Sequence, residues 1–169
     1  MTLALRFRRR FSMAHRLTSG AASKCATPHG HDEYVTVELV ARRPSTLDGE
    51  ANMVAEFGKA KGRWHRFVDE RLDHGLQLSA SDPLLAIARK RFPEWRLIVT
   101  PGDPTTELMA ALLAAKCQAI LDDELEGALR VRRVVLDETP TNAVAFEGDP
   151  REVLPPGDGW WWRPDESTA

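Results

Sequence analysis

The chain has 169 residues, a formal net charge of −2 and two cysteines. That length is ordinary for one domain with a sizeable hydrophobic core. The near-neutral charge does not favour nucleic-acid binding, and no apolar run approaches the roughly 20 residues of a membrane helix. No signal peptide is evident after the N-terminal arginines. Because two cysteines do not make a disulfide framework, we expect a reduced, cytoplasmic setting.

The segment from residue 3 to residue 17 alternates between two kinds of side chain. Its odd positions are mostly apolar and include His15, whereas its even positions carry Arg6, Arg8 and Arg10. A period of two indicates a half-buried strand with one apolar face. His15 is on that face, where a lone histidine is most simply a hydrogen-bonded core residue.

The next motif changes that interpretation. A polar loop leads into Cys25-x-x-x-His29-Gly-His31. In an extended segment His29 and His31 point to the same face, and Gly30 lets the backbone pass close to a metal. Three neutral imidazoles with one open position are typical of a catalytic zinc site, so His15, His29 and His31 are the predicted Zn²⁺ ligands. Cys25 fits three interpretations: a reactive thiolate, a fourth ligand that makes the site structural, or an inert small residue.

The middle of the chain contains one more strand and a helix. Residues 34–43 alternate again and predict a strand antiparallel to the first. Residues 54–72 have helical spacing, and the helix delivers Asp73 and His74 at its end, with Gly75 as a stop signal. At a helix end an aspartate can orient a histidine as a general acid or base, although a surface capping pair has the same sequence.

The second half contains a longer helix and several short elements. The long amphipathic helix begins after Thr105 as N-cap and has Glu107 in its first turn, where the helix dipole favours a carboxylate. The short elements predicted are a helix over residues 83–92 and strands over residues 96–100, 129–139 and 142–147. The order is β-β-α-(insert)-α-β-β, which predicts an α+β fold.

The chain end differs in composition. We expect residues 1–148 to form a single domain and residues 149–169 to form a tail rich in proline, glycine and tryptophan. Trp160, Trp161 and Trp162 are consecutive. They cannot all face one way, so we expect them to cover an exposed surface or a neighbouring subunit.

Taken together, the motifs resemble the family of 6-pyruvoyltetrahydropterin and 6-carboxytetrahydropterin synthases. The resemblance covers roughly Phe7 to Gly148, and several separate motifs occur in the family's order. These motifs are Phe11-Ser-Met-Ala-His15-Arg-Leu17, Cys25-x3-His29-Gly-His31, Phe57-x3-Lys61, Leu72-Asp73-His74, Pro104-Thr-Thr-Glu107 and Glu138-Thr139.

The resemblance implies a tunnelling-type fold, in which an antiparallel sheet is packed by two helices and the subunits assemble into an oligomeric barrel. It implies zinc on the three histidines and a homo-oligomer with its sites at subunit interfaces. Cys25 matches the family's catalytic base. Asp73 and His74 match its proton-relay dyad, which typically reaches the site from a neighbouring subunit.

The resemblance also implies how the substrate is held. Glu138 matches the carboxylate that grips the amino and ring N–H groups of a pterin, assisted by Thr105, Thr106 and Glu107. A carboxylate suits this task because it accepts the parallel donors of a guanidine-like edge in pairs.

The spacing of Cys25 and His29 is like that of the 6-carboxy branch. The implied reaction converts dihydroneopterin triphosphate into 6-carboxytetrahydropterin with loss of acetaldehyde and triphosphate, on the route to 7-deazaguanines and queuosine. The chain departs from the family pattern at Glu33, at Glu56 and in an insert over residues 79–103. The alternatives are therefore a related zinc pterin enzyme, such as the pyruvoyl synthase or a side-chain aldolase, and a non-catalytic protein stapled by zinc.

Overall fold

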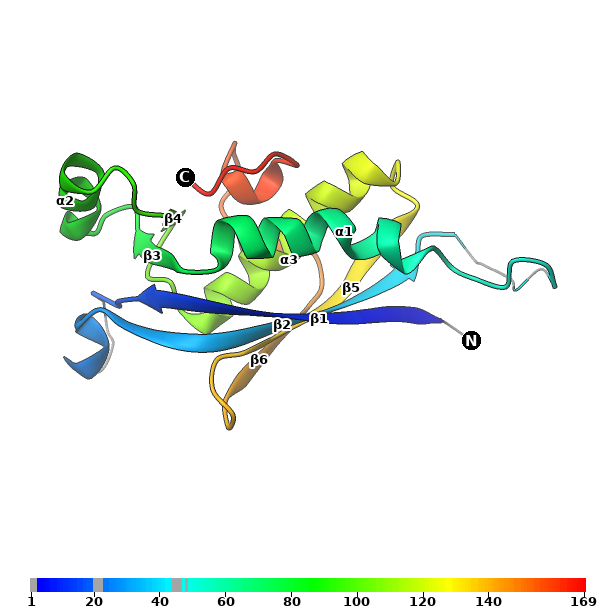
Figure 1. Ribbon diagram of the computed structural model, residues 1–169, viewed down its shortest axis with the longest axis horizontal. Helices are drawn as coiled ribbons and strands as arrows, with labels where there is room; N and C mark the ends of the chain where they lie inside the picture. Colours follow the sequence, from blue (N-terminus) through cyan, green and yellow to red (C-terminus); the bar gives the residue numbers. More distant parts are fainter. Residues whose placement is uncertain (1–2, 20–22, 44–46, 48) are drawn as a thin grey trace.

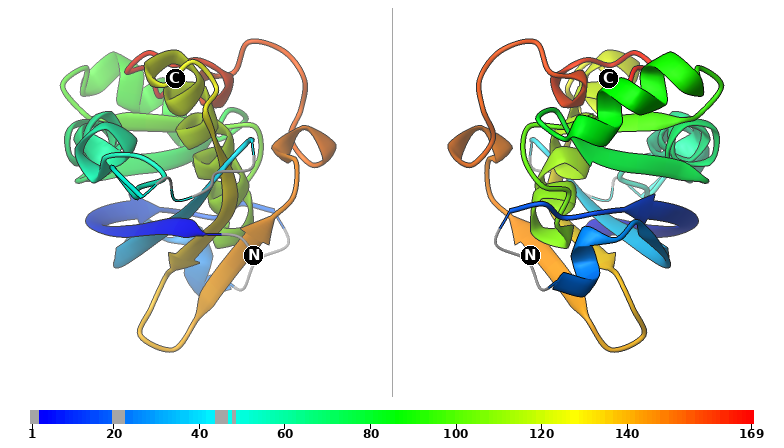
Figure 2. Two further views of the ribbon diagram at one scale, coloured as in Figure 1. Left: turned by 90° about the vertical axis from the view of Figure 1, so that its right-hand side faces the viewer. Right: turned by 90° about the vertical axis from the view of Figure 1, so that its left-hand side faces the viewer.

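The computed structural model describes residues 3–19, 23–43, 47 and 49–169. Its strands form one six-stranded sheet in the order β4-β3-β1-β2-β5-β6. The strands are β1 (Ala4–His15), β2 (His29–Ala41), β3 (Gly75–Ser79), β4 (Leu97–Thr100), β5 (Leu129–Asp137) and β6 (Ala143–Glu147). The helices are α1 (Phe57–Phe67), α2 (Pro83–Arg91) and α3 (Thr106–Glu124). Figures 1 and 2 show α1 and α3 on the same face of the curved sheet.

The alternating segments of the sequence form the centre of this sheet. β1 and β2 pair antiparallel along their whole length, and β5 continues the sheet on the far side of β2. The inward positions Phe11, Val35 and Val37 are buried under the helices. The α+β class and the predicted order of the main elements are thereby confirmed.

The sheet is mixed, whereas the resemblance implied an antiparallel one. β3 pairs parallel with β1, and β4 pairs parallel with β3. The insert explains the difference, because α2 lies between β3 and β4 and makes the crossover that a parallel pair requires. Gly75 is also not a helix stop: it begins β3, and His74 takes the left-handed backbone conformation at φ 59°. A π-helical turn, η2 (Val68–Leu72), separates α1 from His74.

The C-terminal segment packs against the domain. Trp160 and Trp161 are buried in the main core, in contrast to the expected cover over an exposed surface or a neighbour. Lys116 on α3 is fully buried, and its Nζ donates to the carbonyl oxygens of Trp160 at 3.1 Å, Arg163 at 2.8 Å and Asp165 at 2.5 Å. The boundary at residue 148 stays a prediction.

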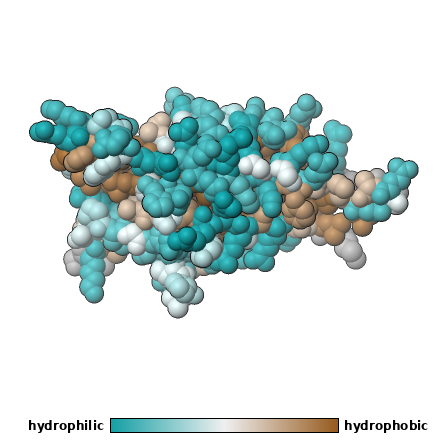
Figure 3. All heavy atoms as spheres, viewed as in Figure 1, coloured by the Kyte–Doolittle hydropathy of each residue, from teal (hydrophilic) through white to brown (hydrophobic). Residues whose placement is uncertain are grey.

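Apolar side chains also reach the surface. Figure 3 shows them at both ends of the molecule, around α2 and around the segment before α1. The residues before α1 include Met53 at 56% exposure, and Phe57 at the start of α1 is 51% exposed. No helix in the described part of the chain is long and apolar enough to cross a membrane.

Candidate functional site

The three predicted metal ligands come together at the end of the first hairpin. His15 is the cross-strand partner of His29, and His31 is opposite Met13. Because the side-chain period of a strand is two, all three imidazoles project from the same face. One nitrogen from each ring lies within 4.8 Å of the others. The structure therefore shows a cluster of three imidazoles that could hold a metal ion.

Hydrogen bonds to carbonyl groups orient two of the three imidazole rings. His15 Nδ1 lies 2.9 Å from the carbonyl oxygen of Pro104, and His29 Nδ1 lies 2.8 Å from that of Thr27. A carbonyl only accepts, so both Nδ1 atoms carry the proton. In neutral rings both Nε2 atoms then present lone pairs, and they lie 3.2 Å apart. Burial also lowers the pKa of His15, which favours the neutral form.

This arrangement fits a cation bound by the Nε2 atoms. Two facing lone pairs repel each other unless a positive charge lies between them. A ligand histidine whose other ring nitrogen donates to a carbonyl is the usual outer-sphere arrangement at metal sites. An all-imidazole donor set suits zinc and other transition metals better than magnesium or calcium, which prefer oxygen.

Gly30 is required at this point by the close approach of the two strands. A Cβ added to Gly30 would lie 2.5 Å from the carbonyl oxygen of Met13. That atom belongs to the backbone of β1 and cannot turn aside as a flexible side chain can. Only glycine therefore lets the β1–β2 pair close with His15, His29 and His31 on one face.

We expect Gly30→Ala to lower the free energy of unfolding by about 2 kcal/mol or more and to weaken metal binding, because the strands must separate at the triad. Gly58→Ala is the matched control, since a Cβ on Gly58 in α1 meets nothing within 4 Å. Glycine within a helix is worse than alanine by roughly 0.5–1 kcal/mol, so the control variant should be slightly more stable. Denaturant unfolding and zinc titration measure both effects. Equal metal affinity in the two variants would contradict the argument.

Cys25 lies in the short 3₁₀ turn Ser23–Ala26 that precedes β2. Its carbonyl oxygen accepts a hydrogen bond of 2.8 Å from the N–H of Leu17, which fastens the turn to the end of β1. The side chain is half-buried and its thiol is free. Among the described residues, Cys25 is outside the set of ligand atoms that lie within 4.8 Å of one another. This position does not favour Cys25 as a fourth ligand.

Asp73 and His74 form a hydrogen-bonded pair. His74 Nδ1 lies 2.7 Å from Asp73 Oδ2, and the other carboxylate oxygen accepts from the N–H of Ser12 at 2.7 Å. Partial burial alone would raise the pKa of Asp73, but the hydrogen bonds from Ser12 and His74 outweigh it and lower the pKa. The His74 side chain is 79% exposed and has the uncommon left-handed backbone. Such a backbone is often found at functional sites, and the ring is available to another molecule.

The residues assigned to substrate binding are only partly brought together. Thr106 Oγ1 donates to Glu138 Oε1 at 2.9 Å, which joins the start of α3 to the end of β5. Thr105 caps α3 and accepts from the N–H of Leu108 at 3.3 Å. Glu107 is exposed in the first turn of α3, and its carboxylate makes no hydrogen bond or ion pair with a described residue.

Glu33, a departure from the family pattern in the sequence, lies on the same face as the histidines. It follows His31 by two residues, so it projects from the same face of β2. It is 1% exposed, and its Oε2 has no hydrogen-bond partner among the described residues. Burial, reinforced by the nearby Glu138 carboxylate, raises the pKa of Glu33 to about 8. The alternation His29, His31, Glu33, Val35 was the signal in the sequence that could have identified it.

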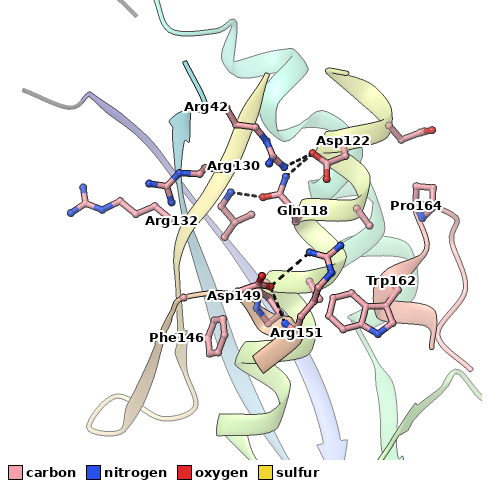
Figure 4. Close-up of a pocket in the computed structure, with 17 residues that line it drawn as sticks. Arg42, Gln118, Asp122, Arg130, Arg132, Phe146, Asp149, Arg151, Trp162 and Pro164 are labelled. Atoms are coloured by element: carbon pink, nitrogen blue, oxygen red, sulfur yellow. Dashed lines mark hydrogen bonds and ion pairs between the residues drawn. The ribbon is translucent and has the colours of Figure 1, made fainter. Parts of the chain in front are cut away.

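A second pocket lies beside α3. It has a volume of about 530 Å³ and lies between α3, β5, β6 and the C-terminal segment. Figure 4 shows Arg42, Gln118 and Asp122 hydrogen-bonded at one end of it, with Arg151 beside the ring of Trp162. None of the predicted site residues lines this pocket. It is separate from the histidine cluster.

Comparison with known proteins identifies the family. The family model described as 6-pyruvoyl tetrahydropterin synthase matches residues 4–149. The chain belongs to this family. The match covers every strand of the sheet and all the predicted site residues. Family membership also confirms the predicted enzyme class, a lyase of the tetrahydropterin synthase type.

Relatives and solved structures agree with this assignment. A probable 6-carboxy-5,6,7,8-tetrahydropterin synthase of Halobacterium salinarum is 30% identical over 131 residues, covering 78% of this chain and 77% of that protein. The 6-carboxy-5,6,7,8-tetrahydropterin synthase of Rickettsia felis is 27% identical over 103 residues, which cover 61% of this chain and 71% of that protein.

Two solved structures support the fold alone. An uncharacterized protein of Wolinella succinogenes is similar with a TM-score of 0.72 at 21% identity, over 88% of this chain and 99% of that one. The 6-pyruvoyl tetrahydropterin synthase of Caenorhabditis elegans is similar with a TM-score of 0.58 at 20% identity, over 88% of this chain and 97% of that one. The subunit fold that the resemblance implied is therefore confirmed, except that its sheet is mixed. The assembly into an oligomeric barrel stays a prediction.

Proposed function

We propose that the chain is a zinc-dependent lyase that converts 7,8-dihydroneopterin triphosphate and water into 6-carboxy-5,6,7,8-tetrahydropterin, acetaldehyde and triphosphate. The observation that carries the proposal is the cluster of His15, His29 and His31. The Nδ1 atoms of His15 and His29 donate to carbonyl groups, and Cys25 lies four residues before His29. The names of the relatives favour the 6-carboxy product.

In this proposal the chain's own groups hold the substrate and move its protons. Glu138, fixed by the hydroxyl of Thr106, accepts the amino and ring N–H groups of the pterin. Thr105 and Glu107 complete that end of the site at the start of α3. Cys25 removes a proton from the substrate side chain as a thiolate, and the Asp73–His74 pair delivers or receives the second proton. Zinc, when bound by the three histidines, supplies Lewis-acid polarisation of the side-chain hydroxyls.

The competing proposals differ in product, so one experiment tests them. The zinc-loaded protein is incubated with dihydroneopterin triphosphate, and the products are identified by mass spectrometry. Carboxytetrahydropterin with acetaldehyde supports the proposal. A pyruvoyl product or a cleaved side chain assigns the chain to a related zinc pterin enzyme. Bound zinc without any product would overturn the enzymatic proposal in favour of a zinc-stapled structural protein.

We also propose that the protein acts as a homo-oligomer in a reduced, cytoplasmic setting, with sites completed between subunits. Three features support the assembly: the exposed His74 ring, the outer edge of β6, which pairs with no described strand, and the exposed apolar side chains of Leu3, Met53 and Phe57. Native mass spectrometry should give a multiple of the chain mass. A monomer at working concentration would contradict this proposal.

A further inference from the structure

The insert carries an exposed aromatic stack. The rings of Phe92 and Trp95 are almost parallel, at 8°, with their centroids 4.2 Å apart. Both side chains are solvent-exposed, Phe92 by 37% and Trp95 by 42%. The backbone N–H of Trp95 donates to the carbonyl oxygen of Phe92 at 3.0 Å, which closes the turn that brings the two residues together. A rigid indole held at the surface offers a large contact area at little cost in conformational entropy.

Trp95 is also part of a pocket that contains His74. The pocket has a volume of about 610 Å³, within the range of small-molecule sites. It lies between the end of β1, the start of β3 and the turn before β4. Its walls include Ser12, Ala14, His74, Glu94, Trp95 and Arg96.

Two hydrogen bonds hold the turn against the histidine pair. The Arg96 guanidinium donates to the carbonyl oxygen of Asp73, and the Arg96 carbonyl oxygen accepts from the N–H of Leu76 at 2.8 Å. These bonds tie the backbone next to Trp95 to the residues on either side of His74. The insert therefore forms one wall of the pocket that contains His74.

We propose that Trp95 is a specificity-determining residue that packs against the hydroxylated side chain of a reduced pterin substrate. This inference rests on the proposed function. A group that transfers protons must lie within hydrogen-bond reach of the reacting atoms, and those atoms are in the side chain. The pterin ring is held elsewhere, by Glu138 and Thr106, neither of which lines the His74 pocket.

Trp95 therefore recognises the side chain and not the ring. The indole face contacts the C–H groups of the three-carbon chain and excludes water from them. In the proposed assembly, each subunit presents this wall, with its His74, to the metal cluster of a neighbour.

The test measures binding without turnover. In zinc-loaded Cys25→Ala protein, affinities are measured by calorimetry for dihydroneopterin triphosphate and for 7,8-dihydropterin, which has the ring and lacks the side chain. Trp95→Ala should weaken binding of the triphosphate at least about tenfold and leave binding of dihydropterin unchanged. Trp95→Phe should recover most of the lost affinity, because a flat ring remains. Ile87→Ala is the matched control, since Ile87 is an exposed residue of α2 outside the pocket.

Each outcome decides the question. Equal loss for both ligands would overturn the inference, because Trp95 would then contact the ring or support the fold. No loss for either would overturn it as well, and a melting temperature lowered only in Trp95→Ala would assign the residue a structural role. Failure of the parent Cys25→Ala protein to bind either ligand would refute the proposed function itself, and the inference with it.

Discussion

Cys25→Ala is expected to retain zinc and to lose turnover. Removing a group that abstracts a proton in the rate-determining step typically lowers kcat by roughly 10²- to 10⁴-fold. The three histidines come from β1 and β2, and Cys25 is outside the cluster of ligand atoms, so the metal site should be unaffected. Zinc content by mass spectrometry, together with steady-state kinetics on dihydroneopterin triphosphate, measures both parts of the expectation.

Cys117 provides the matched control. It is fully buried on α3, and burial raises the pKa of its thiol, so it is unreactive at neutral pH. Cys117→Ala should therefore lose a little stability and keep its activity. If Cys25→Ala turns over at the wild-type rate, Cys25 is not the base. If it loses zinc together with activity, Cys25 is a ligand and the site is structural.

The central part of the site could be predicted because it depends on local periodicity. The alternation of β1 places His15 on the apolar face, and the spacing of His29 and His31 gives them a common face. Pairing of two strands that follow each other in the chain then brings the three rings together. Nothing in that argument needs a long-range contact, which is why it can be made from sequence.

The parallel edge of the sheet could not be predicted in the same way. β3 has only five residues, Gly75 to Ser79, and one of its two neighbours in the sheet, β1, is distant in the chain. Its pairing depends on where α2 lies, and the sequence of the insert does not determine that position. The position of Trp95 follows from the same placement, so the sequence pointed to the insert but did not single out Trp95.

The buried polar groups were the hardest to predict. Lys116 is expected on the polar side of an amphipathic helix, yet residues 109–117 of α3 are all buried, and the C-terminal segment lies over Lys116. Glu33 was noticed as a departure from the family pattern, but its burial beside Glu138 depends on the register of β2 against β5. In both cases a charged side chain predicts exposure, and tertiary packing buries it instead.

Lys116→Met is expected to release the C-terminal segment. The Lys116 ammonium donates to backbone carbonyl oxygens of Trp160, Arg163 and Asp165, and it lies 4.8 Å from the centroid of the Phe67 ring. Methionine keeps the length of the side chain and supplies no donor. The carbonyl groups are then left unpaired, which should lower the free energy of unfolding by about 2–4 kcal/mol.

The release can be observed directly. Trp160 is buried and its Nε1 donates to the carbonyl oxygen of Val99 at 2.7 Å, so its exposure should shift the tryptophan fluorescence to longer wavelength. Lys90→Met is the matched control, because Lys90 is an exposed lysine of α2. An unshifted spectrum and unchanged stability in Lys116→Met would show that other contacts hold the segment.

The pH dependence of stability gives an independent measure of this contact. Burial lowers the pKa of Lys116 from 10.5 to about 8, although the Asp165 carboxylate opposes the shift. Between those two pH values the folded state binds fewer protons than the unfolded state. The free energy of unfolding therefore increases as pH rises from about 8 to 10.5, and it decreases by the same amount when pH is lowered again. The full gain is about 3 kcal/mol, from 1.36 kcal/mol per pKa unit. It should be present in the wild type and absent in Lys116→Met, when both are unfolded in denaturant at each pH. Parallel curves for the two proteins would mean that the ammonium is solvated and does not fasten the segment.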